Sequence, residues 1–123
     1  MWTFLRGDVW KTTLEENPVG SEQGGARPTL VISNNIGNFN APTVIVLPLT
    51  SQLKNGQPTH VTITADFLPK ESVVLAEQIR TVSKGRLTDY LGRLSNEQMQ
   101  AVEQAVAQSL DLIIKNQRSS EHE

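Results

Sequence analysis

The sequence predicts a mainly β domain, a small barrel of short strands, that ends in one helix. Two observations predict it. Short apolar or alternating runs, separated by turn residues, fill the first two-thirds of the chain, and apolar residues recur at helical spacing in the last quarter. With 123 residues, 37% hydrophobic and 20% charged, the chain has the size and composition of one globular domain. We expect that domain over residues 1–115, with a flexible polar tail over 116–123.

Five strands are expected, each bounded by turn residues such as Gly24-Gly25. In chain order they are residues 8–13, 29–33, 43–49, 60–64 and 72–82. The third is apolar throughout, which suits a strand covered on both faces, with Pro48 near its end or at an edge. The fourth alternates, so Val61 and Ile63 should point inward and His60 should lie at the surface.

The C-terminal helix should begin after Ser95, because this serine can cap a helix and is followed three residues later by Gln98, the pattern of a capping box. Apolar residues then recur at steps of three and four, at Met99, Val102, Val106, Leu110 and Ile113. This spacing predicts an apolar face that packs on the barrel.

Composition excludes several classes of function. The chain has no cysteine and only two histidines, His60 and His122, which argues against a structural metal. No apolar run approaches the roughly 20 residues that span a bilayer, and the N-terminus lacks a signal-peptide layout, so we expect a cytoplasmic protein with no membrane partner. The net charge of -2 gives no global basic signal for nucleic acid.

Residues 20–28 read Gly-Ser-Glu-Gln-Gly-Gly-Ala-Arg-Pro and place polar groups before the second expected strand. One interpretation is a polar hairpin loop in which glycine supplies a positive φ and Arg27 is exposed. The other is a cluster of functional groups at the mouth of the barrel. The spacing alone leaves both open.

Four ordered motifs give the chain a close resemblance to the MazF/PemK family, the endoribonuclease toxins of type II toxin–antitoxin pairs. They are Arg-Gly-Asp-Val-Trp at 6–10, Ser-Glu-Gln-Gly-Gly-Ala-Arg-Pro at 21–28, Leu-Pro-Leu-Thr-Ser at 47–51 and Glu-Gln-Ile-Arg-Thr at 77–81. The resemblance runs from about Arg6 to Leu112. It implies an SH3-like barrel with a C-terminal helix, and a homodimer whose interface forms the RNA groove.

The resemblance also implies a reaction that needs no cofactor: sequence-specific, metal-independent cleavage of single-stranded mRNA, in which a ribose 2′-hydroxyl attacks the adjacent phosphorus. Arg27 and Thr50 match the principal catalytic pair of the family, and Glu22 matches an acidic residue credited with acid–base work. Other branches have a histidine one residue before that glutamate, where this chain has Ser21. An arginine suits the stabilisation of phosphoryl charge, because its planar fork can bind two phosphate oxygens.

Substrate binding is expected from polar side chains near the catalytic ones. Gln78 and Arg80 should share one face of the last strand, where an amide can pair with a base edge and a guanidinium with phosphate. The alternative for Arg80 is an ion pair at the surface or in a dimer interface. Further candidates are Ser21, Gln23, Asn38 and Gln52, and Phe39 could stack a base.

The implied protein partner is an antitoxin with an acidic, partly disordered segment, for which Arg80 and Arg86 would form a basic patch. Contact with DNA would come only through the antitoxin complex. Two other functions are compatible with the same barrel fold. A gyrase-poison toxin would bind a topoisomerase without catalysis, although Arg27 and Thr50 argue against it. An SH3-like adaptor would need more exposed Tyr and Trp than this chain has.

Overall fold

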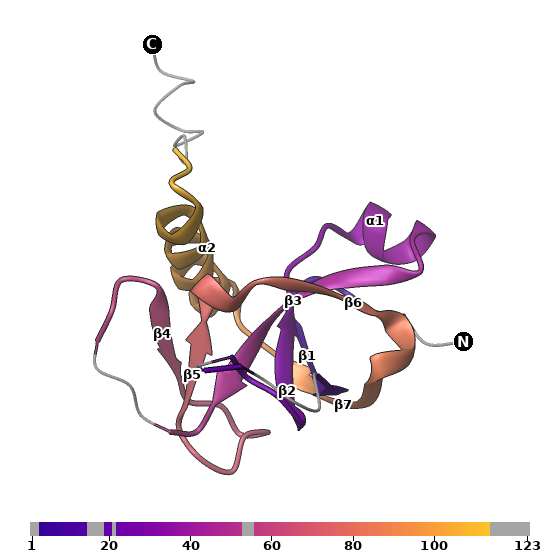
Figure 1. The fold of residues 1–123 in the computed structure, drawn as a ribbon, viewed down its shortest axis with the longest axis horizontal. Helices are drawn as coiled ribbons and strands as arrows, with labels where there is room; N and C mark the ends of the chain where they lie inside the picture. Colours follow the sequence, from indigo (N-terminus) through magenta and orange to yellow (C-terminus); the bar gives the residue numbers. More distant parts are fainter. Residues whose placement is uncertain (1–2, 15–18, 21, 53–55, 114–123) are drawn as a thin grey trace.

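The fold is an antiparallel sheet that curls on itself and is covered at one end by a helix, as Figure 1 shows. In this computed structural model the described residues are 3–14, 19–20, 22–52 and 56–113. Within them lie strands β1 (Asp8–Thr13), β2 (Ala26–Val31), β3 (Thr43–Thr50), β4 (His60–Ile63), β5 (Ser72–Leu75), β6 (Arg80–Ser83) and β7 (Leu87–Arg93). The same residues form helices α1 (Asn35–Asn40) and α2 (Asn96–Leu110), and the 3-10 turns η1 (Ala76–Gln78) and η2 (Lys84–Arg86).

Strand β3 organises the sheet, because it is long enough to pair with three neighbours. The strand order is β4-β5-β3-β2-β1-β7, and β6 pairs with β3 beside this path. The first half of β3 pairs with β6, from Thr43 opposite Ser83 to Val46 opposite Arg80. Its last two residues pair instead with β5. The predicted mainly β fold with a C-terminal helix is confirmed.

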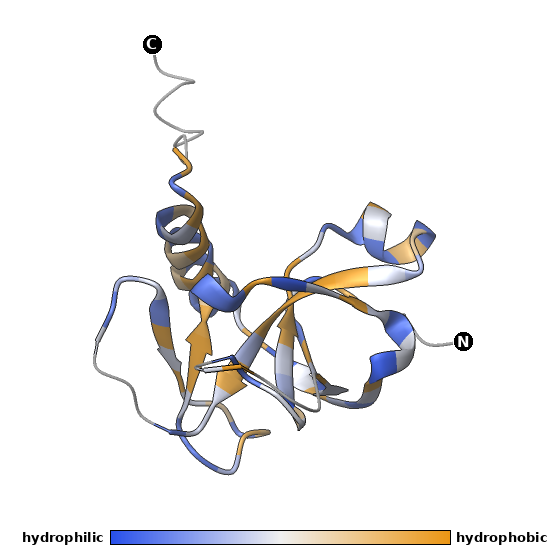
Figure 2. Cartoon of the chain, in the orientation of Figure 1, coloured by the Kyte–Doolittle hydropathy of each residue, from blue (hydrophilic) through white to orange (hydrophobic). Residues whose placement is uncertain are grey.

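Two hydrophobic clusters lie on the two faces of the sheet, as the alternation of side chains along each strand requires. Trp10, Val31 and Val46 belong to the cluster enclosed by the curled sheet. Their sequence neighbours Val9, Leu30 and Leu47 belong to the cluster that α2 covers with Met99, Val102 and Ala105. Figure 2 shows the hydrophobic residues concentrated on the central strands. The sheet that carries the candidate site is therefore fixed by packing on both faces.

Three expectations about local structure are wrong. The single strand expected over 72–82 is interrupted by η1, so that β5 and β6 pair with different halves of β3. Residues 87–93, for which no strand was expected, form β7 and pair with β1. The expected loop after β2 contains the short helix α1, which begins where the Asn34 side chain accepts a hydrogen bond from the Gly37 N–H at 2.7 Å.

Helix α2 begins as predicted but buries less of its apolar stripe. The Ser95 side chain accepts the Gln98 N–H at 3.1 Å, and the Gln98 side chain accepts the Ser95 N–H at 3.0 Å, which confirms the capping box. Met99 and Val102 are buried, whereas Leu110 is 46% exposed and Ile113, beyond the helix end, is 91% exposed. The expectation that Leu110 and Ile113 pack on the barrel is wrong. The tail over 116–123 lies outside the described residues.

Candidate active site

Strand register places Arg27 and Thr50 on the same face of the sheet. The β2–β3 ladder pairs Val31 with Val46 and Thr29 with Pro48. Because side chains alternate with a period of two, Arg27 shares the face of Thr29, and Thr50 shares the face of Pro48. The ladder ends at Thr29 and Pro48, and Arg27 and Thr50 lie two residues beyond that end on their own strands. Alternation therefore gives two side chains that are 23 positions apart in the chain the same face of the sheet, beside the end of the ladder.

Thr50 presents a hydroxyl group that can donate a hydrogen bond. The residue is only 5% exposed, at the end of β3. Its Oγ1 accepts a hydrogen bond from the Gln52 backbone N–H at 3.2 Å. A threonine hydroxyl has one proton and two lone pairs, so this bond leaves the proton for a further acceptor. The bond from Gln52 fixes the position of the Thr50 Oγ1 atom. The side chain of Gln52, two residues after Thr50, is exposed.

Arg27 lies at the start of β2 with its guanidinium turned toward the preceding loop. Its Nε donates a hydrogen bond to the Gly24 carbonyl oxygen at 2.9 Å. This bond uses one of five N–H donors, so the terminal Nη groups can bind an anion in a fixed orientation. Partial burial lowers the pKa of Arg27 by desolvation. The group stays protonated at neutral pH, and its partly dry surroundings strengthen its attraction for a phosphate.

The loop before β2 is held to η1 by one long-range contact. The Gln23 backbone N–H donates to the Gln78 side-chain Oε1 at 2.9 Å, across 55 residues of sequence. Next to Gln23, the exposed Glu22 accepts the Val19 N–H on Oε1 at 2.7 Å. Gly25 takes a φ of 70°, which favours glycine, as the hairpin-loop interpretation expects. The exposed Arg27 of that interpretation is wrong, because Arg27 is half-buried within β2. The contact brings Glu22 and Arg27 to the side of the sheet where η1 lies.

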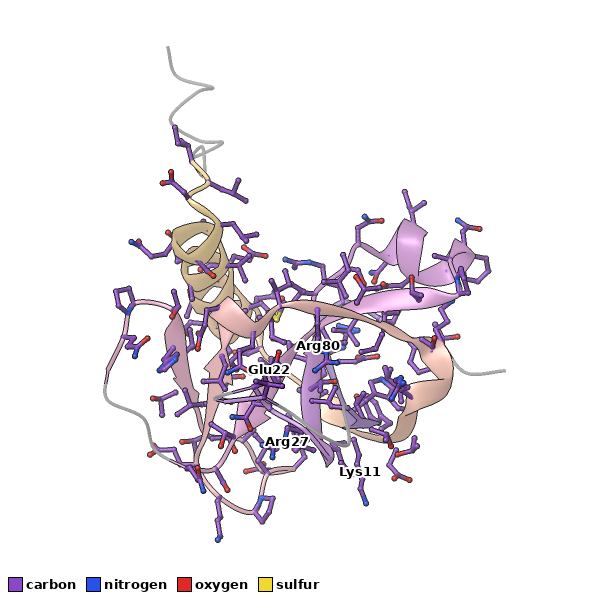
Figure 3. All side chains as sticks on the ribbon, viewed as in Figure 1. Lys11, Glu22, Arg27 and Arg80 are labelled. Carbon is purple, nitrogen blue, oxygen red and sulfur yellow. The ribbon has the colours of Figure 1, made fainter. Side chains whose placement is uncertain are left out.

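In the view of Figure 3, Glu22, Arg27 and Arg80 lie near the centre of the molecule, and Lys11 lies below and to the right of them. Arg80 is half-buried at the start of β6, opposite Val46 of β3. The expectation that Gln78 and Arg80 share a strand face is wrong, because Gln78 belongs to η1. The two residues still flank the same turn, on either side of Ile79. Ser21 lies outside the described residues.

The structure does not bring Asn38 to this cluster. Asn38 is 2% exposed on α1, and its amide donates to the Ser33 carbonyl oxygen at 2.9 Å and accepts the Ser33 hydroxyl. Its polar atoms are therefore engaged in holding α1 to the end of β2. Phe39 on the same helix is 76% exposed.

Two pairs of polar residues near the site were missed by the sequence analysis. The hydroxyls of Thr12 and Thr29 lie 2.7 Å apart, and both residues are fully buried on the face that Arg27 shares. The expectation that His60 lies at the surface is wrong, since its side chain is 7% exposed and bonds to Glu77. A polar residue at an inward position of a strand is the sequence signal for the first pair. The second has no local signal.

Two other classes of site were searched for along the described ranges. Those ranges hold no group of three or more His, Cys, Asp or Glu side chains that could bind a metal ion. Neither helix there has the length and apolar character needed to cross a membrane.

Comparison with known proteins identifies the family. Residues 5–110 match the model of the "PemK-like, MazF-like toxin of type II toxin-antitoxin system". Endoribonuclease EndoA of Bacillus subtilis strain 168 is 50% identical over 111 residues, which cover 88% of this chain and 95% of the relative.

Solved structures agree with this match. An endoribonuclease from a mycobacterial species superposes with a TM-score of 0.77 at 30% identity, covering 94% of this chain and 98% of that one. A mycobacterial endoribonuclease in complex with its cognate antitoxin gives a TM-score of 0.73 at 32% identity, covering 90% and 98%. The membership predicted from four motifs is confirmed: the chain belongs to the PemK-like, MazF-like toxins of type II toxin–antitoxin systems.

Proposed function

We propose that this endoribonuclease toxin cleaves single-stranded mRNA at one short sequence, by attack of a ribose 2′-hydroxyl on the adjacent phosphorus, with Arg27, Thr50 and Glu22 as the catalytic groups. The observation that supports the proposal is the β2–β3 register, from which side-chain alternation gives Arg27 and Thr50 the same face of the sheet, two residues beyond the end of the ladder. A guanidinium and a hydroxyl at that position offer several N–H and O–H donors to one phosphate group.

The reaction needs a base, a charge stabiliser and a proton for the leaving group. Glu22 accepts the proton of the 2′-hydroxyl, because its bond to Val19 leaves acceptor capacity on the carboxylate. The 2′-oxygen then bonds to phosphorus, and the bond from phosphorus to the 5′-oxygen breaks. The leaving oxygen takes a proton from solvent, to which the Glu22 side chain is exposed. The products are a 2′,3′-cyclic phosphate and a 5′-hydroxyl.

Arg27 and Thr50 act on the phosphoryl oxygens, where negative charge grows as phosphorus becomes five-coordinate. The Nη groups of Arg27 donate to these oxygens while Nε stays on Gly24. The Thr50 hydroxyl donates from a position fixed by Gln52. Donors that are held in place before the reaction stabilise the transition state at little cost in reorganisation. No metal ion enters this scheme.

Sequence selection comes from polar side chains other than the three catalytic ones. Ser21, Gln23, Gln52, Gln78 and Arg80 are the proposed substrate contacts, with the amides reading base edges and Arg80 binding backbone phosphate. Asn38 is left in a supporting role, since its amide already binds Ser33.

The partners of the chain belong to the same proposal. We infer a cytoplasmic homodimer, neutralised by an antitoxin whose acidic segment binds near Arg80 and Arg86. A mycobacterial relative of known structure is described in complex with its cognate antitoxin. Changing both arginines to alanine should weaken antitoxin binding, and an unchanged affinity in calorimetry would remove these residues from the interface.

Primer extension on a long RNA tests the proposal. The purified protein is incubated with the RNA in EDTA, beside an Arg27→Ala variant of equal fold and oligomeric state. We expect discrete stops at one short sequence that disappear in the variant. Intact RNA with the folded protein, or stops that require added Mg²⁺, would contradict the proposal.

A further inference from the structure

A buried histidine side chain pairs with the exposed Glu77 next to Gln78 and has no part in the proposed chemistry. The His60 side chain is 7% exposed, and its Nε2 lies 3.0 Å from Glu77 Oε2. The other ring nitrogen, Nδ1, is buried with no hydrogen-bond partner in the described part of the chain. Burial of an imidazole nitrogen without a partner costs free energy, which the bond from Nε2 to Glu77 offsets in part.

The pair joins the first residues of β4 to η1. Besides the His60–Glu77 bond, the Ala76 N–H donates to the Thr59 carbonyl oxygen at 2.9 Å. Burial raises the pKa of Glu77, but hydrogen bonds from His60, from its own backbone N–H and from Thr59 outweigh this and leave the pKa below its ordinary value. Glu77 is therefore an ionised carboxylate that accepts several hydrogen bonds. These bonds hold η1 in place directly after β5.

Gln78, the residue after Glu77, connects η1 to the loop before β2. Gln78 accepts the Gln23 N–H at 2.9 Å, and Gln23 lies between Glu22 and Gly24. The Gly24 carbonyl oxygen in turn accepts the Arg27 Nε–H at 2.9 Å. A continuous series of hydrogen bonds and short backbone links thus runs from His60 to both Glu22 and Arg27.

We propose that His60 and Glu77 are positioning residues for the nuclease reaction: their pair fixes η1, so that Gln78 holds the Gln23 loop with Glu22 and Arg27 in reactive geometry. The inference rests on the proposed function. His60 does not reach the reacting atoms itself, because β5 separates its strand from β3. Its effect is on geometry, and a misplacement of about 1 Å in a catalytic group can cost roughly 100-fold in rate.

Two substitutions at one position separate the hydrogen bond from the volume of the side chain. His60→Leu fills the space without a donor, whereas His60→Gln can place an amide N–H near the position of Nε2. On a short RNA carrying the cleaved sequence, we expect kcat to fall about 10-fold or more in His60→Leu with little change in KM. His60→Gln should keep most of the wild-type kcat. Equal loss in both variants would contradict a role for the bond.

A double-mutant cycle tests whether the effect passes through Gln78. In a Gln78→Ala background the loop is already released, so His60→Leu should lower kcat by less than about twofold. Additive losses would overturn the proposed route. Ile63→Val serves as the stability control, because Ile63 is 1% exposed on the same strand and belongs to the cluster under α2. It should lower the melting temperature without the loss in kcat.

Amide hydrogen exchange at Gln23 tests, without any cleavage assay, whether the His60–Glu77 pair holds the loop that contains Gln23. We expect exchange of this N–H to accelerate in His60→Leu and in Gln78→Ala, while exchange in the middle of β2 stays unchanged. Unchanged exchange at Gln23 in His60→Leu would refute the positioning role. If wild-type protein did not cleave RNA, the proposed function would fail, and the exchange result would still decide whether the pair holds the loop.

Discussion

Replacement of Arg27 is the perturbation with the largest expected effect on cleavage. The proposed function gives the Nη donors of this side chain to the scissile phosphate, and its Nε donates a hydrogen bond to Gly24 in the loop before β2. Removal of one donor to a developing oxyanion costs about 100- to 1000-fold in kcat. Loss of an ordinary hydrogen bond adds about 0.5–1.5 kcal/mol. We therefore expect Arg27→Ala to lower kcat/KM about 1000-fold or more.

Two further variants divide that loss between charge and geometry. Arg27→Lys keeps the charge but loses the planar fork and the Gly24 bond, so its rate should fall between those of wild type and Arg27→Ala. Lys11→Ala removes an equal charge from an exposed residue of the neighbouring strand, on the other face of the sheet, and should cleave at a rate close to wild type. The assay is single-turnover cleavage of a labelled RNA. Arg27→Ala within about threefold of wild type would refute the reasoning.

Three other changes test the site and its framework. Thr50→Val should lower kcat about 10- to 100-fold in the same assay, because it removes the hydroxyl donor but keeps the volume. Gly92→Ala should destabilise the fold by about 1–3 kcal/mol in urea unfolding, since an added Cβ would lie 2.2 Å from the Phe67 ring. Glu77→Gln should reduce the free energy of unfolding most at neutral pH. The folded-state pKa of Glu77 is lowered, so its contribution is present above the unfolded pKa and disappears as the pH falls through the folded pKa.

Each of these changes has a matched control. Thr50→Ser keeps the hydroxyl and should retain activity, and its failure beside Thr50→Val would point to packing instead. Gly85→Ala adds a Cβ with no atom within 4 Å, so a loss equal to that of Gly92→Ala would contradict the clash. For Glu77, a difference from wild type that stays constant from pH 7 to acid would contradict the ionised hydrogen-bonded carboxylate.

The strands could be predicted where alternation or a continuous apolar run marks them. Strand β1 has the predicted bounds, and β3 extends one residue past them to Thr50. The break at η1 could not be predicted, because the apolar run of β5 continues into Ala76 without a turn residue. At that break η1 contacts His60 of β4 and Thr59 just before it, residues far from η1 in the sequence. Strand β7 carries exposed polar residues at an edge, so its pattern resembles a charged surface segment.

In the candidate site too, the residues could be predicted from local motifs, whereas their arrangement depends on long-range contacts. Motifs and the resemblance single out Arg27 and Thr50, but their shared face depends on the β2–β3 register, which no spacing in the sequence gives. The Gln23–Gln78 bond spans 55 residues, so the position of the loop depends on a contact that no local pattern indicates. Asn38 shows the reverse case, since an asparagine in a polar segment proves to be buried on a helix.

The measurement that tests the central claim most directly is cleavage of an RNA with a single 2′-deoxynucleotide on the 5′ side of the scissile phosphate. The account predicts that this substrate stays intact in EDTA, while the all-ribose RNA yields a 2′,3′-cyclic phosphate and a 5′-hydroxyl. Cleavage of the deoxy-substituted RNA at the same position would contradict attack by the 2′-hydroxyl, and with it the roles assigned to Glu22, Arg27 and Thr50.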